Sequence, residues 1–168
     1  MNGFLSPKRV ATMGGMALAL FWTIFLLGQG STGFAPSFAS LGLVEALMAA
    51  GLVAGLLLAL MVIRVGLRRF LSEDFADGQP FPLGHPGLTD ARVLSNTAEQ
   101  VVLAAMVWPI AGHLFGAGLV VALLAGFILA RLLFWFGYHY WPWLRATAFA
   151  MTLYPTVGAG LWSVTRLV

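Results

Sequence analysis

Five apolar runs follow one another along the chain, and short polar or glycine- and proline-rich segments separate them. Each run is long enough to cross a bilayer as a helix, which needs about 20 residues. The pattern therefore predicts an all-α fold, an integral membrane helical bundle. We expect the membrane-spanning helices at 10–28, 41–63, 92–114, 119–138 and 144–164.

The first apolar run, 10–28, has a basic flank and is followed by small residues at 30–35. Two interpretations fit this arrangement, a cleaved signal peptide and a retained span. The apolar stretch is long for a signal peptide, so we favour a retained span. We therefore divide the chain into an N-terminal helix and loop at 1–35 and a membrane domain at 36–168.

Composition supports the membrane assignment and removes several classes of function. The chain is 60% hydrophobic and 9% charged, whereas soluble domains are about 25% charged. The chain has no basic tract of the kind that would indicate a nucleic-acid partner. Cysteine is absent, which excludes disulfides, thiolate metal sites and a cysteine nucleophile. The three histidines fall at different ends of the spans, so we expect no metal site.

Lysine and arginine positions predict the orientation. If the spans alternate in direction, one side of the membrane has only Arg166. The opposite side has Lys8, Arg9, Arg64, Arg68, Arg69 and Arg145. The positive-inside rule then puts the N-terminus, the polar segment 70–90 and the turn at Pro142 in the cytoplasm. Prolines and glycines argue against a regular helix through 70–90. Thr89 or Asp90 is our candidate N-cap for the third span.

The third span opens with polar side chains. Arg92, Asn96 and Glu99 are spaced i, i+4, i+7, so they share one face of a helix. Ionisable groups inside a span are costly and normally face the bundle interior or a water-filled cavity. This stretch is therefore our leading candidate for a functional site.

Other polar groups reach the same depth from different spans. Arginines bind carboxylates with two parallel hydrogen bonds, a carboxylate holds an ammonium group, and a tyrosine donates a hydrogen bond. Such a set suits a small zwitterion with more than one carboxylate. The groups are Arg64, Arg68, Arg69, Arg92, Asn96, Glu99, Gln100, Arg131, Tyr138 and Arg145.

Structural interpretations remain open for several of these residues. Arg92 and Arg131 are long enough to reach the interface and pair with lipid phosphates. Glu99 is also a candidate ion-pair partner for either arginine. The tryptophans near Pro142 are expected to anchor the interface, and Gly14-Gly15 and Gly51-x-x-x-Gly55 are expected to be helix-packing contacts.

Three motifs, in order, resemble those of the membrane-associated proteins in eicosanoid and glutathione metabolism, the MAPEG family. Arg92-x-x-x-Asn96-x-x-Glu99 resembles the family's Arg/Asn/Glu motif. Ala130-Arg131-Leu132-x-Phe134-x-x-Gly137-Tyr138, followed by Leu144-Arg145, resembles its second motif, and Arg68-Arg69 resembles its basic pair. The resemblance covers about 45–168, which is four spans. It implies a four-helix core, to which the first span is an addition.

The resemblance also implies a function. Family members form homotrimers that bind glutathione between subunits near the cytoplasmic face. By this resemblance, Arg92, Asn96, Glu99, Arg131 and Tyr138 would hold glutathione with Arg68 or Arg69. Arg145 would be the catalytic residue that stabilises the glutathione thiolate, because a nearby cation lowers a thiol pKa from about 8.5. The expected activity is that of a glutathione-dependent transferase or peroxidase acting on lipophilic substrates among membrane lipids. The resemblance is to bacterial-type members of the family, so we expect the protein in a bacterial inner membrane.

The sequence differs from the eicosanoid enzymes at Leu94, Gln100 and Phe134, where some members have tyrosine or another polar residue. This motivates a second hypothesis, a non-enzymatic protein of the same fold that binds a lipid or an acidic metabolite. A third hypothesis is a small transporter, supported only by the charges inside the spans.

Overall fold

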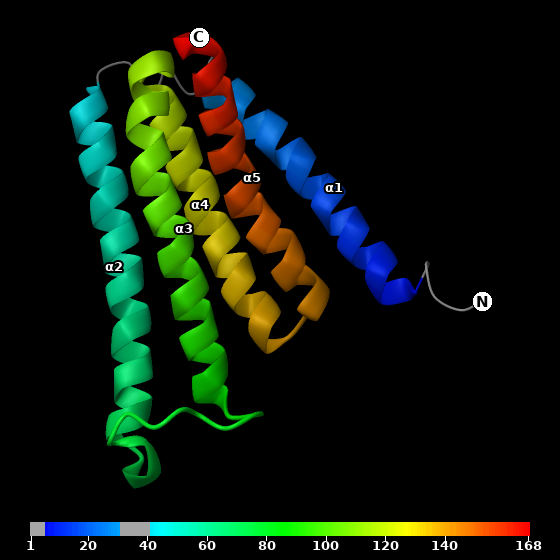
Figure 1. Cartoon of the computed structure of the whole chain (residues 1–168), viewed down its shortest axis with the longest axis vertical. Helices are drawn as coiled ribbons and strands as arrows, with labels where there is room; N and C mark the ends of the chain where they lie inside the picture. Colours follow the sequence, from blue (N-terminus) through cyan, green and yellow to red (C-terminus); the bar gives the residue numbers. More distant parts are fainter. Residues whose placement is uncertain (1–5, 31–40) are drawn as a thin grey trace.

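The computed structural model describes residues 6–30 and 41–168, which form five long α-helices and one 3-10 turn (Figure 1). The expected all-α membrane bundle is confirmed, since the described residues contain no strand. The small residues expected at 30–35 to mark a possible cleavage region lie, except for Gly30, outside the described residues. The elements are α1 (Pro7–Gly28), α2 (Leu43–Phe70), η2 (Glu73–Phe75), α3 (Pro86–Phe115), α4 (Ala117–His139) and α5 (Pro142–Leu167).

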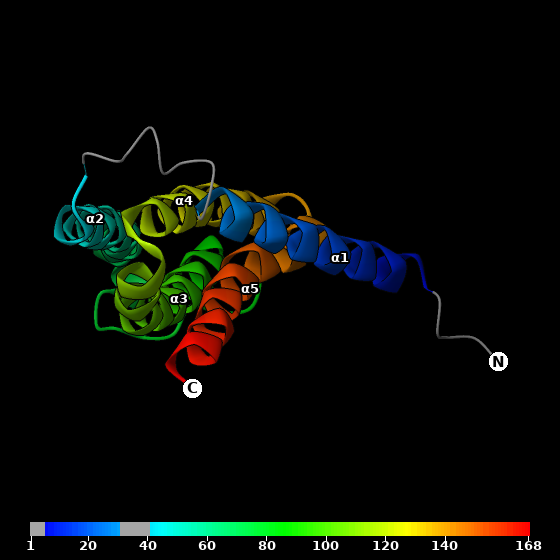
Figure 2. The ribbon, with the colours of Figure 1, turned by 90° about the horizontal axis from the view of Figure 1, so that it is seen from above.

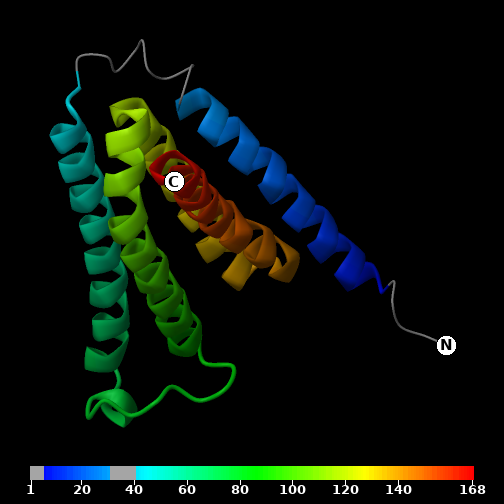
Figure 3. The same cartoon turned by 45° about the horizontal axis from the view of Figure 1, so that its top comes forward.

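Consecutive helices run in alternating directions, so that α4 and α5 form an antiparallel hairpin (Figure 1). Seen from above, α2, α4 and α1 lie along one side and α3 and α5 along the other (Figure 2). On the side of the η2 loop, α2 and α3 extend beyond the α4–α5 hairpin (Figure 3). This arrangement brings the end of α2, the start of α3 and the α4–α5 turn to one end of the bundle.

Within the described residues, four helices are long and apolar enough to cross a membrane, namely α1 from Arg9, α2, α3 and α4. The helix α5 has 26 residues but is more polar than the others. Four of its hydroxyl side chains are buried, and three of them, Thr147, Thr152 and Ser163, donate hydrogen bonds to carbonyls three or four residues earlier. A helix can carry such side chains in an apolar environment because their polar groups are satisfied internally.

The helix α3 begins earlier than the apolar pattern indicates. Its N-cap is His85, whose Nδ1 accepts a hydrogen bond from the Gly87 amide at 3.0 Å, and Pro86 occupies the first helical position. Proline is favoured there because its missing N–H would have had no partner in the helix. Thr89 and Asp90 therefore lie inside the helix, and the prediction that one of them caps it is wrong.

The additional helix α1 packs along α5 and touches α4. Small side chains permit the close approach, because a Cβ on Gly15 would overlap the hydroxyl of Thr147. The packing role expected for Gly14-Gly15 is thus confirmed for Gly15, whereas Gly14 meets nothing within 4 Å. By contrast, Gly51 and Gly55 meet nothing within 4 Å, so the contact expected for them does not occur within one chain.

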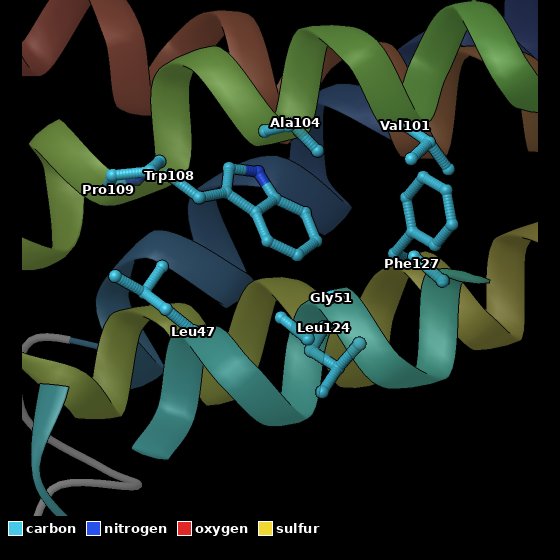
Figure 4. A pocket seen from close by; sticks show the side chains of 11 residues that line it. Leu47, Gly51, Val101, Ala104, Trp108, Pro109, Leu124 and Phe127 are labelled. Atoms are coloured by element: carbon cyan, nitrogen blue, oxygen red, sulfur yellow. The ribbon is translucent and has the colours of Figure 1, made fainter. Parts of the chain in front are cut away.

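A cavity of about 210 Å³ lies between α2, α3 and α4, and Trp108 and Phe127 project into it (Figure 4). The indole Nε1 of Trp108 donates to the Thr156 hydroxyl at 3.2 Å, so its one polar group is satisfied on the far side. The other lining side chains are aliphatic or proline, together with Gly51. The cavity holds no ionisable or nucleophilic group and offers no chemistry of its own.

Candidate functional site

An open groove of about 600 Å³ runs between α3, α4 and α5, and we call it the α3–α4–α5 groove. Four side chains with polar groups line it: Asn96 from α3, Tyr138 from α4, and Arg145 and Tyr154 from α5. The rest of the lining is apolar and includes Phe149 from α5 and Met16 from α1. The groove therefore joins a polar, cationic part to an apolar wall.

Arg145 lies in the first turn of α5, and its guanidinium stacks over the Tyr138 ring at 4.8 Å from the ring centroid. The side chain is exposed and pairs with no carboxylate among residues 6–30 and 41–168. The positive end of the α5 dipole lies at the same place. An anion in this part of the groove would meet both a free guanidinium and a helix N-terminus.

Gly137 sets the position of Arg145. A Cβ on Gly137 would overlap the backbone nitrogen of Arg145 and lie 2.8 Å from its Cα. The obstacle is backbone, which cannot rotate away as a flexible side chain does. Glycine at 137 therefore allows the start of α5 to approach α4 closely enough to place Arg145 over Tyr138.

Replacing Gly137 by alanine is expected to lower the free energy of unfolding by about 1 to 3 kcal/mol, the usual cost of overpacking. The Arg145 guanidinium should also move away from the Tyr138 ring. Thermal unfolding in detergent measures the first effect. The matched control is Gly51→Ala, because Gly51 faces open space in its helix and alanine is the better helix former. Equal stability of the two variants would contradict the role given to Gly137.

Arg131 is fully buried behind the groove and joins three helices. Its guanidinium donates from Nη1 to Asn96 Oδ1 on α3 at 2.9 Å and from Nη2 to the Thr152 hydroxyl on α5. It also stacks over Phe134 at 4.3 Å. Arg131 therefore does not reach the interface, and it fixes the Asn96 side chain that lines the groove.

Arg92, Asn96 and Glu99 share one side of α3. The Asn96 amide lies 3.5 Å from Glu99 Oε2, while Arg92 and Glu99 are exposed. Neither Arg92 nor Arg131 forms an ion pair with Glu99 in the described part of the chain, so that pairing is absent from a single chain. The shared face predicted for the three motif residues points outward from this chain, and only Asn96 lines the groove.

The buried carboxylate of Asp90 contacts three basic side chains, and the sequence pattern did not predict these contacts. Its carboxylate contacts Arg64 Nε at 3.0 Å, accepts a hydrogen bond from Arg68 Nε, and lies 3.7 Å from His139 Nε2. It thereby ties α2 and α4 to the N-terminal part of α3. The available signal was the i, i+4 spacing of the two arginines, which presents both to one anion.

Arg69, the second residue of the basic pair, contacts the polar segment between α2 and α3. Arg69 donates from Nη1 to the carbonyl of Gln79 at 2.9 Å, and its guanidinium stacks over Phe81 at 4.8 Å. Phe81 in turn stacks on His85, the cap of α3. Arg68 and Arg69 are therefore engaged outside the α3–α4–α5 groove of their own chain.

Gln100 is buried inside the bundle and does not line the groove. Its Oε1 accepts no hydrogen bond from the residues that the structure describes. The candidate residues thus fall into distinct groups. The groove contains Asn96, Tyr138 and Arg145, the support behind it is Arg131, the outward face of α3 carries Arg92 and Glu99, and the α2 end carries Arg68 and Arg69.

This helical membrane bundle holds an amide, two phenols and an arginine without a carboxylate partner among the described residues in one groove. It is therefore a small polytopic membrane protein with a polar site near one end. The model of the MAPEG family matches residues 46–165, which is most of the chain. The chain belongs to the MAPEG family. The matched segment holds α2 to α5 nearly complete, and α1 lies outside it. No curated protein and no solved structure matches the chain.

Proposed function

We propose that this protein binds glutathione in the α3–α4–α5 groove and uses its thiolate on lipophilic substrates from the bilayer. The observation that carries the proposal is the convergence of Asn96, Tyr138 and Arg145 on one groove from three helices. Its volume of about 600 Å³ lies in the range of small-molecule sites. Membership of the MAPEG family supports glutathione as the co-substrate.

The chemistry assigned to Arg145 is stabilisation of negative charge on sulfur. A cation beside the thiol favours the thiolate, which is the reacting nucleophile. In conjugation the sulfur forms a bond to an electrophilic carbon, and the leaving group departs with its electron pair. In peroxide reduction the sulfur attacks the terminal oxygen, the O–O bond breaks, and the alkoxide takes a proton. A second glutathione then reduces the sulfenic form and yields glutathione disulfide and water.

We further propose that a neighbouring copy completes the site in a homotrimer in the cytoplasmic half of a bacterial inner membrane, with the N-terminus cytoplasmic. Arg92 and Glu99 support this, because they face outward from a helix that is apolar enough to span a membrane. Charged groups on such a helix avoid lipid and face protein or water. A second chain covering this face would place Arg92 beside the groove of its neighbour.

Complementation between subunits tests the shared site. Arg92→Ala and Arg145→Ala chains are each expected to be inactive in a glutathione transferase assay. If each site takes Arg92 from one chain and Arg145 from another, random mixing on co-expression restores about a quarter of the sites. Recovery of activity in purified mixed assemblies is the expected result. Mixed assemblies that stay as inactive as the single variants would contradict a site shared between chains.

A non-enzymatic binding protein is the second candidate. Phe134 lines the groove without a hydroxyl and Gln100 turns into the bundle, so the groove offers few donors besides Asn96, its two tyrosines and Arg145. Such a groove suits an acidic metabolite or a lipid. Glutathione turnover by the purified protein on any lipophilic electrophile or hydroperoxide would exclude this candidate.

A further inference from the structure

A second groove, of about 270 Å³, lies between α2 and α4, and we call it the α2–α4 groove. It shares no lining residue with the α3–α4–α5 groove. Most of its wall is aliphatic and includes Leu57, Leu60 and Met61 from one side of α2. Arg64, Arg131 and Trp135 complete it, so an apolar channel ends at two arginines and an indole.

The arginine end of this groove carries excess positive charge. Asp90 is the one carboxylate that the described contacts bring to Arg64 and Arg68, and Arg131 has only neutral partners. Arg64 contacts Asp90 through Nε alone, and 44% of its side chain is exposed. Its guanidinium stacks over Trp135 at 5.2 Å. The terminal nitrogens of Arg64 are thus left for a further anion.

Arg131 adds a second unsatisfied donor. Its side chain is fully buried, and its Nε donates no hydrogen bond within the described residues. A buried donor without a partner is costly. The groove therefore brings a buried cation and an exposed cation to the same apolar channel.

The depth of Arg64 matches that of a lipid headgroup. The helix α2 has 28 residues, which is about 42 Å at about 1.5 Å per residue, whereas a hydrocarbon core is about 30 Å thick. The part of α2 before Arg64 spans roughly this thickness, so Arg64 lies where the phosphates begin. A tryptophan beside it is typical of this interface.

We propose that the α2–α4 groove binds one anionic membrane phospholipid. An acyl chain lies along Leu57, Leu60 and Met61, and the phosphate accepts hydrogen bonds from the terminal nitrogens of Arg64. The lipid is a structural ligand that fills the groove between α2 and α4. It takes no part in the chemistry of the other groove, so the assignment stands independently of glutathione.

Native mass spectrometry of the detergent-purified protein tests this site. The protein is given equal amounts of phosphatidylglycerol and phosphatidylcholine with the same acyl chains. We expect preferential retention of phosphatidylglycerol, and Arg64→Gln should reduce that preference about fivefold, the value of one arginine near an anionic lipid. Arg166→Gln, at the opposite end of the bundle, is the matched control and should leave the preference unchanged.

Two further arms identify the ligand. Leu60→Trp fills the channel without changing charge and should reduce retention of phosphatidylglycerol, and Leu60 is exposed, so the fold tolerates the change. Inorganic phosphate in excess should not displace the lipid. Equal retention of the two lipids by the unaltered protein, or a preference that survives both Arg64→Gln and Leu60→Trp, would overturn the proposal. Displacement by phosphate alone would also overturn it, because the groove would then bind an anion rather than a lipid.

Discussion

Replacing Arg145 by alanine is expected to lower glutathione-dependent turnover by about 100-fold or more, the usual effect of removing one electrostatic stabiliser of a reacting anion. The guanidinium stacks over Tyr138 and pairs with no carboxylate among the described residues, so its charge is available to a thiolate. The oligomer and the thermal stability should change little, because the side chain is exposed. A transferase assay at saturating glutathione measures the effect.

Two variants sharpen the interpretation of that experiment. Arg145→Lys keeps a cation and should retain part of the activity. Arg166→Ala removes the same charge from the opposite end of α5 and should behave as the unaltered protein does. If Arg145→Ala retains full turnover, the thiolate is stabilised elsewhere and Arg145 is not catalytic.

Replacing Arg131 by methionine is expected to lower the free energy of unfolding by about 2 to 4 kcal/mol. The change leaves Asn96 Oδ1 and the Thr152 hydroxyl without their donor, and each buried group that loses its partner costs about 1 to 3 kcal/mol. Asn96 would also lose its fixed orientation in the groove, so glutathione affinity should fall. Denaturation in detergent micelles measures the stability, and calorimetry measures the affinity.

Arg166→Met is the matched control for the stability of Arg131→Met. Arg166 is exposed in the last turn of α5 and forms no ion pair with the described residues of the chain, so its loss should leave the stability within about 0.5 kcal/mol. Equal stability of the two variants would show that the buried contacts of Arg131 do not hold the helices together.

The periodic pattern predicted the helices because burial in lipid demands long apolar runs. The ends of those runs are not the ends of the helices. The helix α2 continues past 63 through three arginines to Phe70, since arginine is a good helix former and its charge lies outside the hydrocarbon. The helix α3 starts at Pro86 because a proline at the first turn and a capping histidine favour an earlier start.

The candidate site was only partly predictable. Helical spacing indicated that Asn96 shares a face with Arg92 and Glu99, and the motif spacing indicated Arg145. Spacing within one helix does not tell which side chain faces another helix. The bond from Arg131 to Asn96 and the contacts of Asp90 join side chains on different helices, so they could be found only from the three-dimensional packing.

The most direct test of the account is calorimetric measurement of glutathione binding to the detergent-purified protein and to Arg92→Ala. We expect saturable binding with one glutathione per chain, and weaker binding by Arg92→Ala. The absence of binding at millimolar glutathione would contradict the account and would assign the α3–α4–α5 groove to a different ligand.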